Sequence, residues 1–137
     1  LDVLHAAVLL YRMEKLCGVI DKRRNNVNLY RELIQAKEVF IPTCKPHEQN
    51  AFVMFIIQAK RRDKLKEFLD GRGIQTLVYY AKALHLQPAA KQYNYKWGDF
   101  PVAEKQADEV LALPHHQYLT NDQIKFVSES INEFYQL

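Results

Sequence analysis

Glycine, cysteine and long apolar runs are all scarce in this sequence. Its 137 residues include four glycines and two cysteines. It holds no Walker loop, no G-x-G-x-x-G loop and no G-x-S-x-G elbow, which excludes a self-contained phosphate cradle and a hydrolase nucleophile of that type. No stretch approaches the roughly 18 apolar residues of a membrane-spanning helix, so we expect no membrane partner.

The cysteines and the five histidines show no metal-binding pattern. Cys17 and Cys44 stand outside any CxxC motif, and the histidines form no HExxH motif, so we predict no metal site. Cys17 falls on an apolar helical stripe, which predicts a packed thiol rather than a nucleophile. Reduced thiols and the lack of a signal-peptide pattern indicate a cytoplasmic protein.

Positive and negative charges are nearly balanced. Nineteen Lys and Arg residues against sixteen Asp and Glu residues leave a formal net charge of +3. The basic clusters 22–24 and 60–62 lie beside the acids Asp21 and Asp63, which is typical of a solvated helix face. We therefore expect no nucleic-acid partner, because such a module would need a phosphate-binding track whose affinity falls steeply with salt.

Apolar periodicity predicts helices in the first 36 residues. Hydrophobic residues make up 48% of the chain, as in an ordinary globular domain. Leu4, Val8 and Tyr11 recur at helical spacing, in a helix that starts without a capping residue. Gly18 predicts a kink or break, after which the helical stripe continues to about Ala36.

Four segments have the composition of extended structure. Residues 39–41 form a short apolar run that ends at a proline. Residues 51–57 form a dense β-favouring run, which predicts a strand buried on both faces. Residues 74–80 predict a second strand, and residues 110–113 predict a third extended element.

Glycine and proline mark two further helices. Residues 62–70 have helical spacing and are followed by Gly71 and Gly73, which supply a helix stop and a tight turn. Residues 87–93 predict a short helix with Pro88 in its first turn, where the missing N–H costs little.

Polar residues mark the starts of the last two helices. Asp99 predicts an N-cap before Pro101. The apolar side of that helix would comprise Val102, Ala103, Ala107, Val110 and Leu111. A capping box from Thr120 to Gln123 opens the final helix. Its buried stripe would comprise Ile124, Val127, Ile131, Phe134 and Tyr135. Helices alternating with short strands predict a small α/β or α+β fold, with helices covering one sheet.

The richest cluster of reactive side chains follows the predicted strand 74–80. It contains Tyr79, Tyr80, Lys82 and His85. Because ligands meet α/β sheets at strand ends, one interpretation is a loop that presents phenol, ammonium and imidazole groups to a polar ligand. The other is that the tyrosines alternate between core and surface while His85 only hydrogen-bonds a carbonyl. Composition leaves both open.

Five segments then stand out in order along nearly the whole chain. They are Leu1–Val8 (LDVLHAAV), Gly73–Tyr80 (GIQTLVYY), Leu84–Ala89 (LHLQPA), Gly98–Glu104 (GDFPVAE) and Leu111–Pro114 (LALP). In order and spacing they resemble successive landmarks of the DegT/DnrJ/StrS family of pyridoxal-phosphate-dependent sugar aminotransferases.

The resemblance implies the C-terminal part of a fold-type-I aminotransferase, with a short, mostly antiparallel sheet covered by helices. Residues 1–36 would be a long helical segment leaving the large cofactor domain, which we expect upstream of Leu1. Residues 37–137 would be the small C-terminal domain. In this family a lysine holds pyridoxal phosphate as a Schiff base. No lysine here matches that motif, so we assign no catalytic or cofactor-binding residue, and this segment alone should be inactive.

The family's reaction transfers an amino group, usually from glutamate, to the keto group of a nucleotide-linked deoxysugar, and its members are homodimers. The resemblance leans towards members that act on 3-keto-6-deoxy sugars. It implies that Tyr79, Tyr80 and His85 approach the sugar or diphosphate, with Lys82 as a candidate for the phosphate charge. Family members carry His-Tyr-Pro where this chain has Tyr79-Tyr80-Ala81, so the histidine's role does not transfer to Tyr79.

A second hypothesis is a standalone, noncatalytic α/β binding or interaction module that kept the small-domain fold. Tyr80, His85 and the 98–104 segment favour the enzyme lineage. A full-length enzyme should bind pyridoxal phosphate through a specific lysine, whereas such a module should not.

Overall fold

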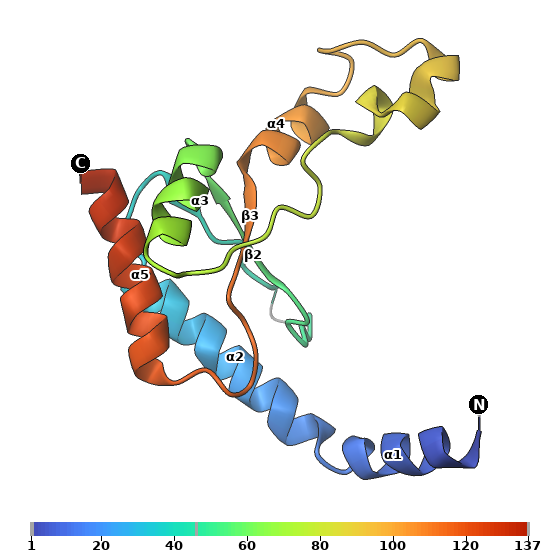
Figure 1. The fold of residues 1–137 in the computed structure, drawn as a ribbon, viewed down its shortest axis with the longest axis vertical. Helices are drawn as coiled ribbons and strands as arrows, with labels where there is room; N and C mark the ends of the chain where they lie inside the picture. Colours follow the sequence, from blue (N-terminus) through green and yellow to red (C-terminus); the bar gives the residue numbers. More distant parts are fainter. Residues whose placement is uncertain (1, 46, 137) are drawn as a thin grey trace.

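The computed structural model describes residues 2–45 and 47–136. A body of helices around a small sheet carries two projections, the N-terminal helix α1 (Val3–Met13) and a long segment before helix α4 (Pro101–Glu109) (Figure 1). None of the described helices is long and apolar enough to cross a membrane.

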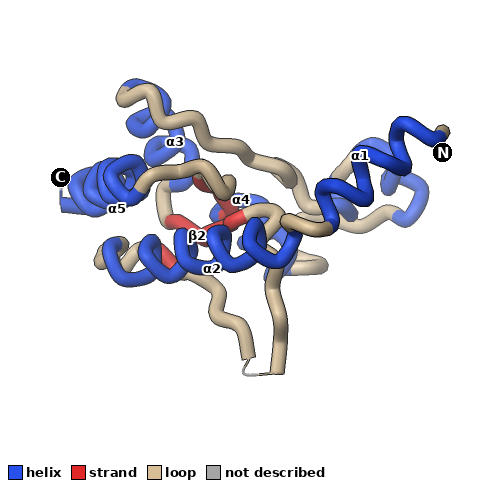
Figure 2. The backbone as a smooth tube through the Cα atoms, turned by 90° about the horizontal axis from the view of Figure 1, so that it is seen from below, coloured by secondary structure: helices blue, strands red, loops and turns tan. Residues whose placement is uncertain are grey.

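The sheet is antiparallel throughout, which confirms the predicted sheet type. Its strands are β1 (Val39–Phe40), β2 (Phe55–Ala59) and β3 (Val110–Leu113), in the order β1-β2-β3. Phe55 pairs with Leu113 and Gln58 with Val110. The strands lie in the middle of the body, with α2 (Leu16–Leu33), α3 (Arg62–Gly71) and α5 (Asn121–Gln136) around them (Figure 2).

One buried cluster joins the sheet to the three helices. The helices contribute Val27, Tyr30, Leu65, Leu69, Ile124, Val127, Ile131 and Phe134, the strands contribute Phe55, Ile57, Ala59, Leu111 and Leu113, and Ile34 and Ile74 follow the ends of α2 and α3. Tyr30 stacks on Phe55 with ring centroids 5.1 Å apart, and its hydroxyl donates to the carbonyl of Pro114 at 3.0 Å. Because the hydroxyl is buried, the pKa of Tyr30 is raised well above its usual value.

The N-terminal helix differs from its prediction at both ends. Asp2 does cap it, since its Oδ1 accepts the His5 N–H at 2.9 Å. The break falls at Glu14 and Lys15, not at Gly18, which lies inside α2. A helical glycine costs only about 1 kcal/mol, and α2 is held by the core contacts of its second half. Cys17 is exposed on this helix, so the predicted packed thiol is wrong.

Helix α2 ends at Leu33, three residues before the predicted end at Ala36. The side chain of Asn132 on α5 accepts the N–H groups of Gln35 and Ala36 at 2.8 and 3.2 Å and donates to the Leu33 carbonyl at 2.8 Å. The Asn132 side chain therefore takes the place of the backbone hydrogen bonds that another helical turn would have formed.

The strand predicted at 51–57 starts four residues later and buries one face. Phe52 has a φ of 46°, outside the extended region, and its N–H donates to Asn50 Oδ1 at 2.7 Å. This local turn stops the extended backbone from starting earlier. Within β2, Phe55, Ile57 and Ala59 are buried while the residues between them are half-buried, so the prediction of burial on both faces is wrong.

The predicted strand 74–80 is also wrong. Only Leu77 pairs with β3, exchanging two hydrogen bonds with Ala112 at 2.8 and 3.1 Å. The segment crosses β3 at this point and leaves the body, so no ladder forms. The preceding stop is confirmed: Gly73 has a φ of +74°, and the Ile74 N–H donates to the Leu69 carbonyl at 2.9 Å.

Of the two predicted helix caps before α4 and α5, the first is wrong and the second is confirmed. Asp99 does not cap α4, because its side chain instead accepts the Lys96 N–H at 2.8 Å. That helix ends at Glu109, so Val110 and Leu111 belong to β3 rather than to its apolar side. The capping box is confirmed, with Gln123 N–H to Thr120 Oγ1 at 3.2 Å and the reciprocal bond at 3.0 Å.

Candidate functional site

The segment from Tyr79 to Phe100, here called the aromatic arm, carries all four candidate residues. It leaves the body after Leu77, reaches away from the sheet and returns at α4 (Figure 1). Two 3-10 helices lie within it, η1 (Leu84–Leu86) and η2 (Pro88–Tyr93), and η2 confirms the short helix predicted over residues 87–93 with Pro88 in its first turn. Its large exposed side chains are Tyr79, Tyr80, Leu84, Tyr93, Tyr95, Trp97 and Phe100.

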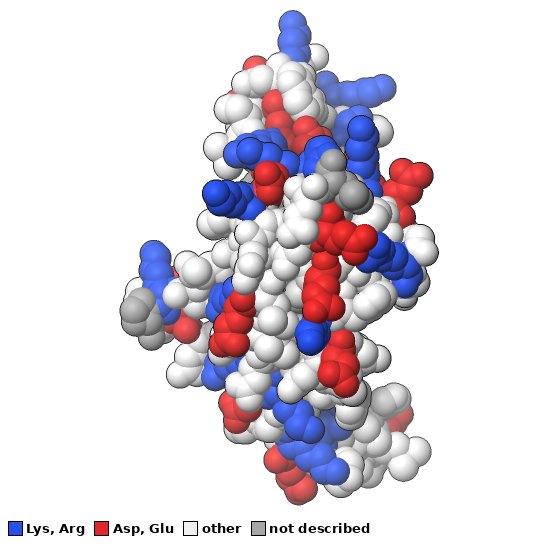
Figure 3. Space-filling model, turned by 90° about the vertical axis from the view of Figure 1, so that its left-hand side faces the viewer, with Lys and Arg blue, Asp and Glu red and all other residues white. Residues whose placement is uncertain are grey.

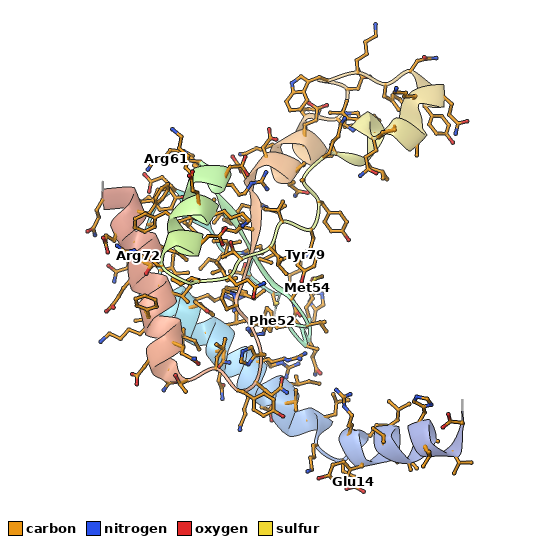
Figure 4. All side chains as sticks on the ribbon, in the orientation of Figure 1. Glu14, Phe52, Met54, Arg61, Arg72 and Tyr79 are labelled. Carbon is orange, nitrogen blue, oxygen red and sulfur yellow. The ribbon has the colours of Figure 1, made fainter. Side chains whose placement is uncertain are left out.

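The two tyrosines lie where the arm joins the body. Tyr79 is 49% exposed and Tyr80 is 66% exposed, so both phenols are accessible. Tyr79 lines a hollow of about 520 Å³ together with Met54, Leu77, Gln75, His115 and Gln123. Figure 4 shows Tyr79 beside Met54, at the side of the body from which the arm leaves. The structure therefore brings Tyr79 next to a cavity, as a substrate-facing residue requires.

Lys82 lies three residues further along the arm. Its side chain is exposed, and it makes no ion pair with any residue that the structure describes. Its ammonium group is thus available to an anionic ligand that approaches the base of the arm.

His85 is the candidate that the structure places differently. Its side chain is only 7% exposed, and its Nε2 lies 2.9 Å from Oε1 of Glu104 on α4. The ring also packs against Phe100, with centroids 4.8 Å apart. The imidazole is therefore occupied by a carboxylate of the same chain and does not lie open beside the two tyrosines.

Glu104 is the important residue that sequence reasoning missed. Its side chain is 4% exposed, and it accepts the N–H groups of Gly98 and Phe100 as well as the bond from His85. The available signal was an acidic residue three positions from the buried Ala107, on the inward face of α4. A charged side chain on a buried helix face indicates that hydrogen-bond donors of the same chain surround it.

His115 lies on another wall of the hollow. Its ring is 5.9 Å from that of Phe55 and 6.3 Å from that of Phe52, measured between centroids. Burial, reinforced by the nearby Arg23 charge, lowers the pKa of His115 to about 4. The ring is consequently neutral near pH 7.

The described residues do not fit pyridoxal phosphate. Its lysine must be held in a shielded site beside a phosphate cup of backbone amides. Every lysine here is exposed except Lys66, which is half-buried and paired with Asp70. Among the described residues no group of three or more metal-ligating side chains converges either. None of these lysines therefore offers the shielded Schiff-base site that the cofactor needs.

On the face drawn in Figure 3, basic and acidic side chains are interspersed. No continuous basic track is visible on that face. This arrangement agrees with the charge pattern of the sequence and does not favour a phosphate backbone as a ligand.

Comparisons with known proteins agree with the sequence resemblance. The model of the DegT/DnrJ/EryC1/StrS aminotransferase family matches residues 1–132. The "Pleiotropic regulatory protein" of Geobacillus stearothermophilus is 37% identical over 99% of the chain, which covers 37% of that relative. The "dTDP-3-amino-3,4,6-trideoxy-alpha-D-glucose transaminase" of Streptomyces venezuelae is 32% identical over 98% of the chain, which covers 36% of that relative.

A solved structure shows the same fold over the whole chain. The crystal structure of S. venezuelae DesV, in complex with a ketimine intermediate, has a TM-score of 0.93 and 30% identity. It covers 100% of this chain, which in turn covers 37% of DesV. The chain thus spans little more than a third of the length of the proteins that it matches.

Proposed function

Because this chain belongs to the DegT/DnrJ/EryC1/StrS aminotransferase family, we propose that it is the C-terminal part of a pyridoxal-phosphate-dependent sugar aminotransferase. The complete enzyme transfers an amino group from glutamate to the keto group of a nucleotide-linked deoxysugar. The observation that carries this proposal is the match to DesV across the whole chain, with a TM-score of 0.93.

The role of this segment is to form one wall of the sugar-nucleotide cleft. Pyridoxal phosphate, when bound by the rest of the enzyme, supplies an electron sink. The exposed phenols of Tyr79 and Tyr80 hydrogen-bond the sugar or diphosphate, and the exposed ammonium group of Lys82 pairs with the diphosphate. His85 supports this surface from its buried position beside Glu104.

The amino group goes to carbon 3 of the sugar in this proposal. Support comes from the printed names of two relatives, a dTDP-3-amino-3,6-dideoxy-alpha-D-galactopyranose transaminase and a dTDP-3-amino-3,4,6-trideoxy-alpha-D-glucose transaminase. These names agree with the 3-keto-6-deoxy preference expected from the sequence.

The exposed apolar surface of α1 packs against the large cofactor domain or a second subunit. No residue of α1 is buried, and Val3, Leu4, Leu10 and Met13 are each at least 65% exposed. Water-exposed apolar patches of this kind are typical of interfaces. We therefore propose a cytoplasmic homodimer in which residues 1–36 connect the large domain to the small domain at 37–137.

The test uses the complete polypeptide that carries this chain, loaded with pyridoxal phosphate. Glutamate should convert the bound cofactor, and a nucleotide-linked 3-keto-6-deoxyhexose should restore it, both followed by absorbance. Tyr80→Phe should raise the KM for the sugar about tenfold, because the lost hydrogen bond is to a charged or multiply hydroxylated ligand. Tyr118→Phe is the matched control, since Tyr118 is 78% exposed outside the aromatic arm. An inactive wild-type enzyme, or equal effects of the two variants, would contradict the proposal.

The second candidate function is a noncatalytic binding module. Sequencing the source DNA upstream of the Leu1 codon separates the two: a cofactor domain with its lysine in the same frame supports the enzyme, and a start codon directly before Leu1 supports the module.

A further inference from the structure

The two halves of the aromatic arm meet at one buried carboxylate. His85, from the first half, lies 2.9 Å from Glu104 Oε1. Gly98, from the second half, donates its N–H to both carboxylate oxygens at 2.8 and 3.0 Å, and the Phe100 N–H reaches Oε1 at 3.3 Å. Glu104 therefore joins both halves to α4.

This carboxylate is compensated entirely by the arm. No lysine or arginine of the described chain pairs with Glu104, whose one ion-pair partner there is His85. A buried carboxylate needs such partners, because leaving it or its donors unsatisfied is costly. Glu104 and its three partners, His85, Gly98 and Phe100, therefore satisfy one another's hydrogen-bonding groups.

Little else anchors the arm to the body. Within residues 79–100, Ala83 is buried as a whole residue, and the side chain of His85 is 7% exposed. Aromatic rings of the arm also pack on one another, such as Tyr95 with Phe100 at 5.0 Å between centroids. Removing the carboxylate should therefore loosen the arm without disturbing the core.

We propose that Glu104 is a positioning residue that closes the aromatic arm and so holds Tyr79, Tyr80 and Lys82 in place for the nucleotide-linked sugar. His85 acts through Glu104 and not on the reacting atoms. The inference rests on the proposed function for its substrate, and on the geometry of the described residues for the closure itself.

The closure is tested by hydrogen exchange in the complete polypeptide. In Glu104→Ala, the amides of Gly98 and Phe100, within the segment 96–100, should exchange about tenfold faster or more, because their buried acceptor is lost. Glu104→Gln keeps one acceptor oxygen and should show a smaller increase. Asp108→Asn is the matched control, since Asp108 is exposed on the same helix and the substitution removes the same charge. It should exchange like the wild type.

The positioning role is tested by separating the two half-reactions. Glu104→Gln should raise the KM for the nucleotide-linked sugar about tenfold, while the conversion of bound cofactor by glutamate alone keeps its wild-type rate. His85→Phe keeps the ring packing against Phe100 but loses the bond to Glu104, so it should reproduce this pattern. The double variant should add little to either single one, since both remove the same contact.

Two results would overturn the inference. One is unchanged exchange at 96–100 in Glu104→Ala when the wild type is active. The other is an equal loss of both half-reactions in Glu104→Gln and His85→Phe, which indicates general unfolding. A wild-type enzyme that transaminates no nucleotide-linked sugar overturns the proposed function instead, and accelerated exchange at 96–100 would still establish the closure.

Discussion

Replacing Asn132 by alanine removes three hydrogen bonds between α5 and the end of α2. Two are accepted from the N–H groups of Gln35 and Ala36, and one is donated to the Leu33 carbonyl. Each such bond contributes roughly 0.5–1.5 kcal/mol net. Because Gln35 is exposed and water can replace its bond, we expect Asn132→Ala to lower the free energy of unfolding by about 2 kcal/mol.

Urea unfolding of the 137-residue chain, followed by circular dichroism, measures this loss. A 2 kcal/mol change should lower the midpoint by about 1 M at an unchanged slope. Asn28→Ala is the matched control, because Asn28 is exposed on α2 and its side chain makes one hydrogen bond within the described residues, accepting from Arg31 at 3.4 Å. If Asn132→Ala stays within about 0.5 kcal/mol of this control, Asn132 does not determine where α2 ends.

Two further predictions concern glycine and histidine. Gly73→Ala should lower the free energy of unfolding by about 1 kcal/mol, because the φ of +74° at Gly73 is unfavourable for alanine. Gly18→Ala should raise it by about 0.5–1 kcal/mol, because Gly18 lies within a helix and an added Cβ would meet no atom within 4 Å. Urea midpoints of both variants check this, and the same sign for both would refute it. Because the pKa of His115 falls from 6.5 to about 4 on folding, the unfolded chain binds more protons between those values, so stability should decline as pH falls from about 6.5 towards 4. His115→Gln should flatten that decline in urea midpoints, and an unchanged pH slope would contradict the role of this ring.

Local signals predicted the elements whose partners lie within a few residues. The Thr120–Gln123 capping box, the stop at Gly73 and the short helix with Pro88 in its first turn are all confirmed, and each depends on a contact or dihedral angle within one turn of chain. The β-favouring composition of 110–113 likewise predicted β3. These features could be predicted because backbone geometry and nearby side chains determine them.

The elements that were wrongly predicted depend on residues distant in sequence. The end of α2 depends on Asn132, 96 or more positions away. Residues 74–80 have strand composition but meet β3 at one bridge only, because the chain then turns outward into the arm. Periodicity cannot show whether a β-favouring segment will find an edge to pair with, since that depends on tertiary structure.

His85 shows the same limit at the candidate site. Its position shortly after a β-favouring segment suggested a ligand contact, and the two tyrosines before it are indeed accessible. The residue that determines the environment of His85 is Glu104, nineteen positions later on α4, and no local pattern links the two. His85 and Glu104 are a buried pair that contacts both halves of the arm. A family resemblance can therefore point to a candidate segment, while the assignment of each side chain to ligand or scaffold requires its contacts.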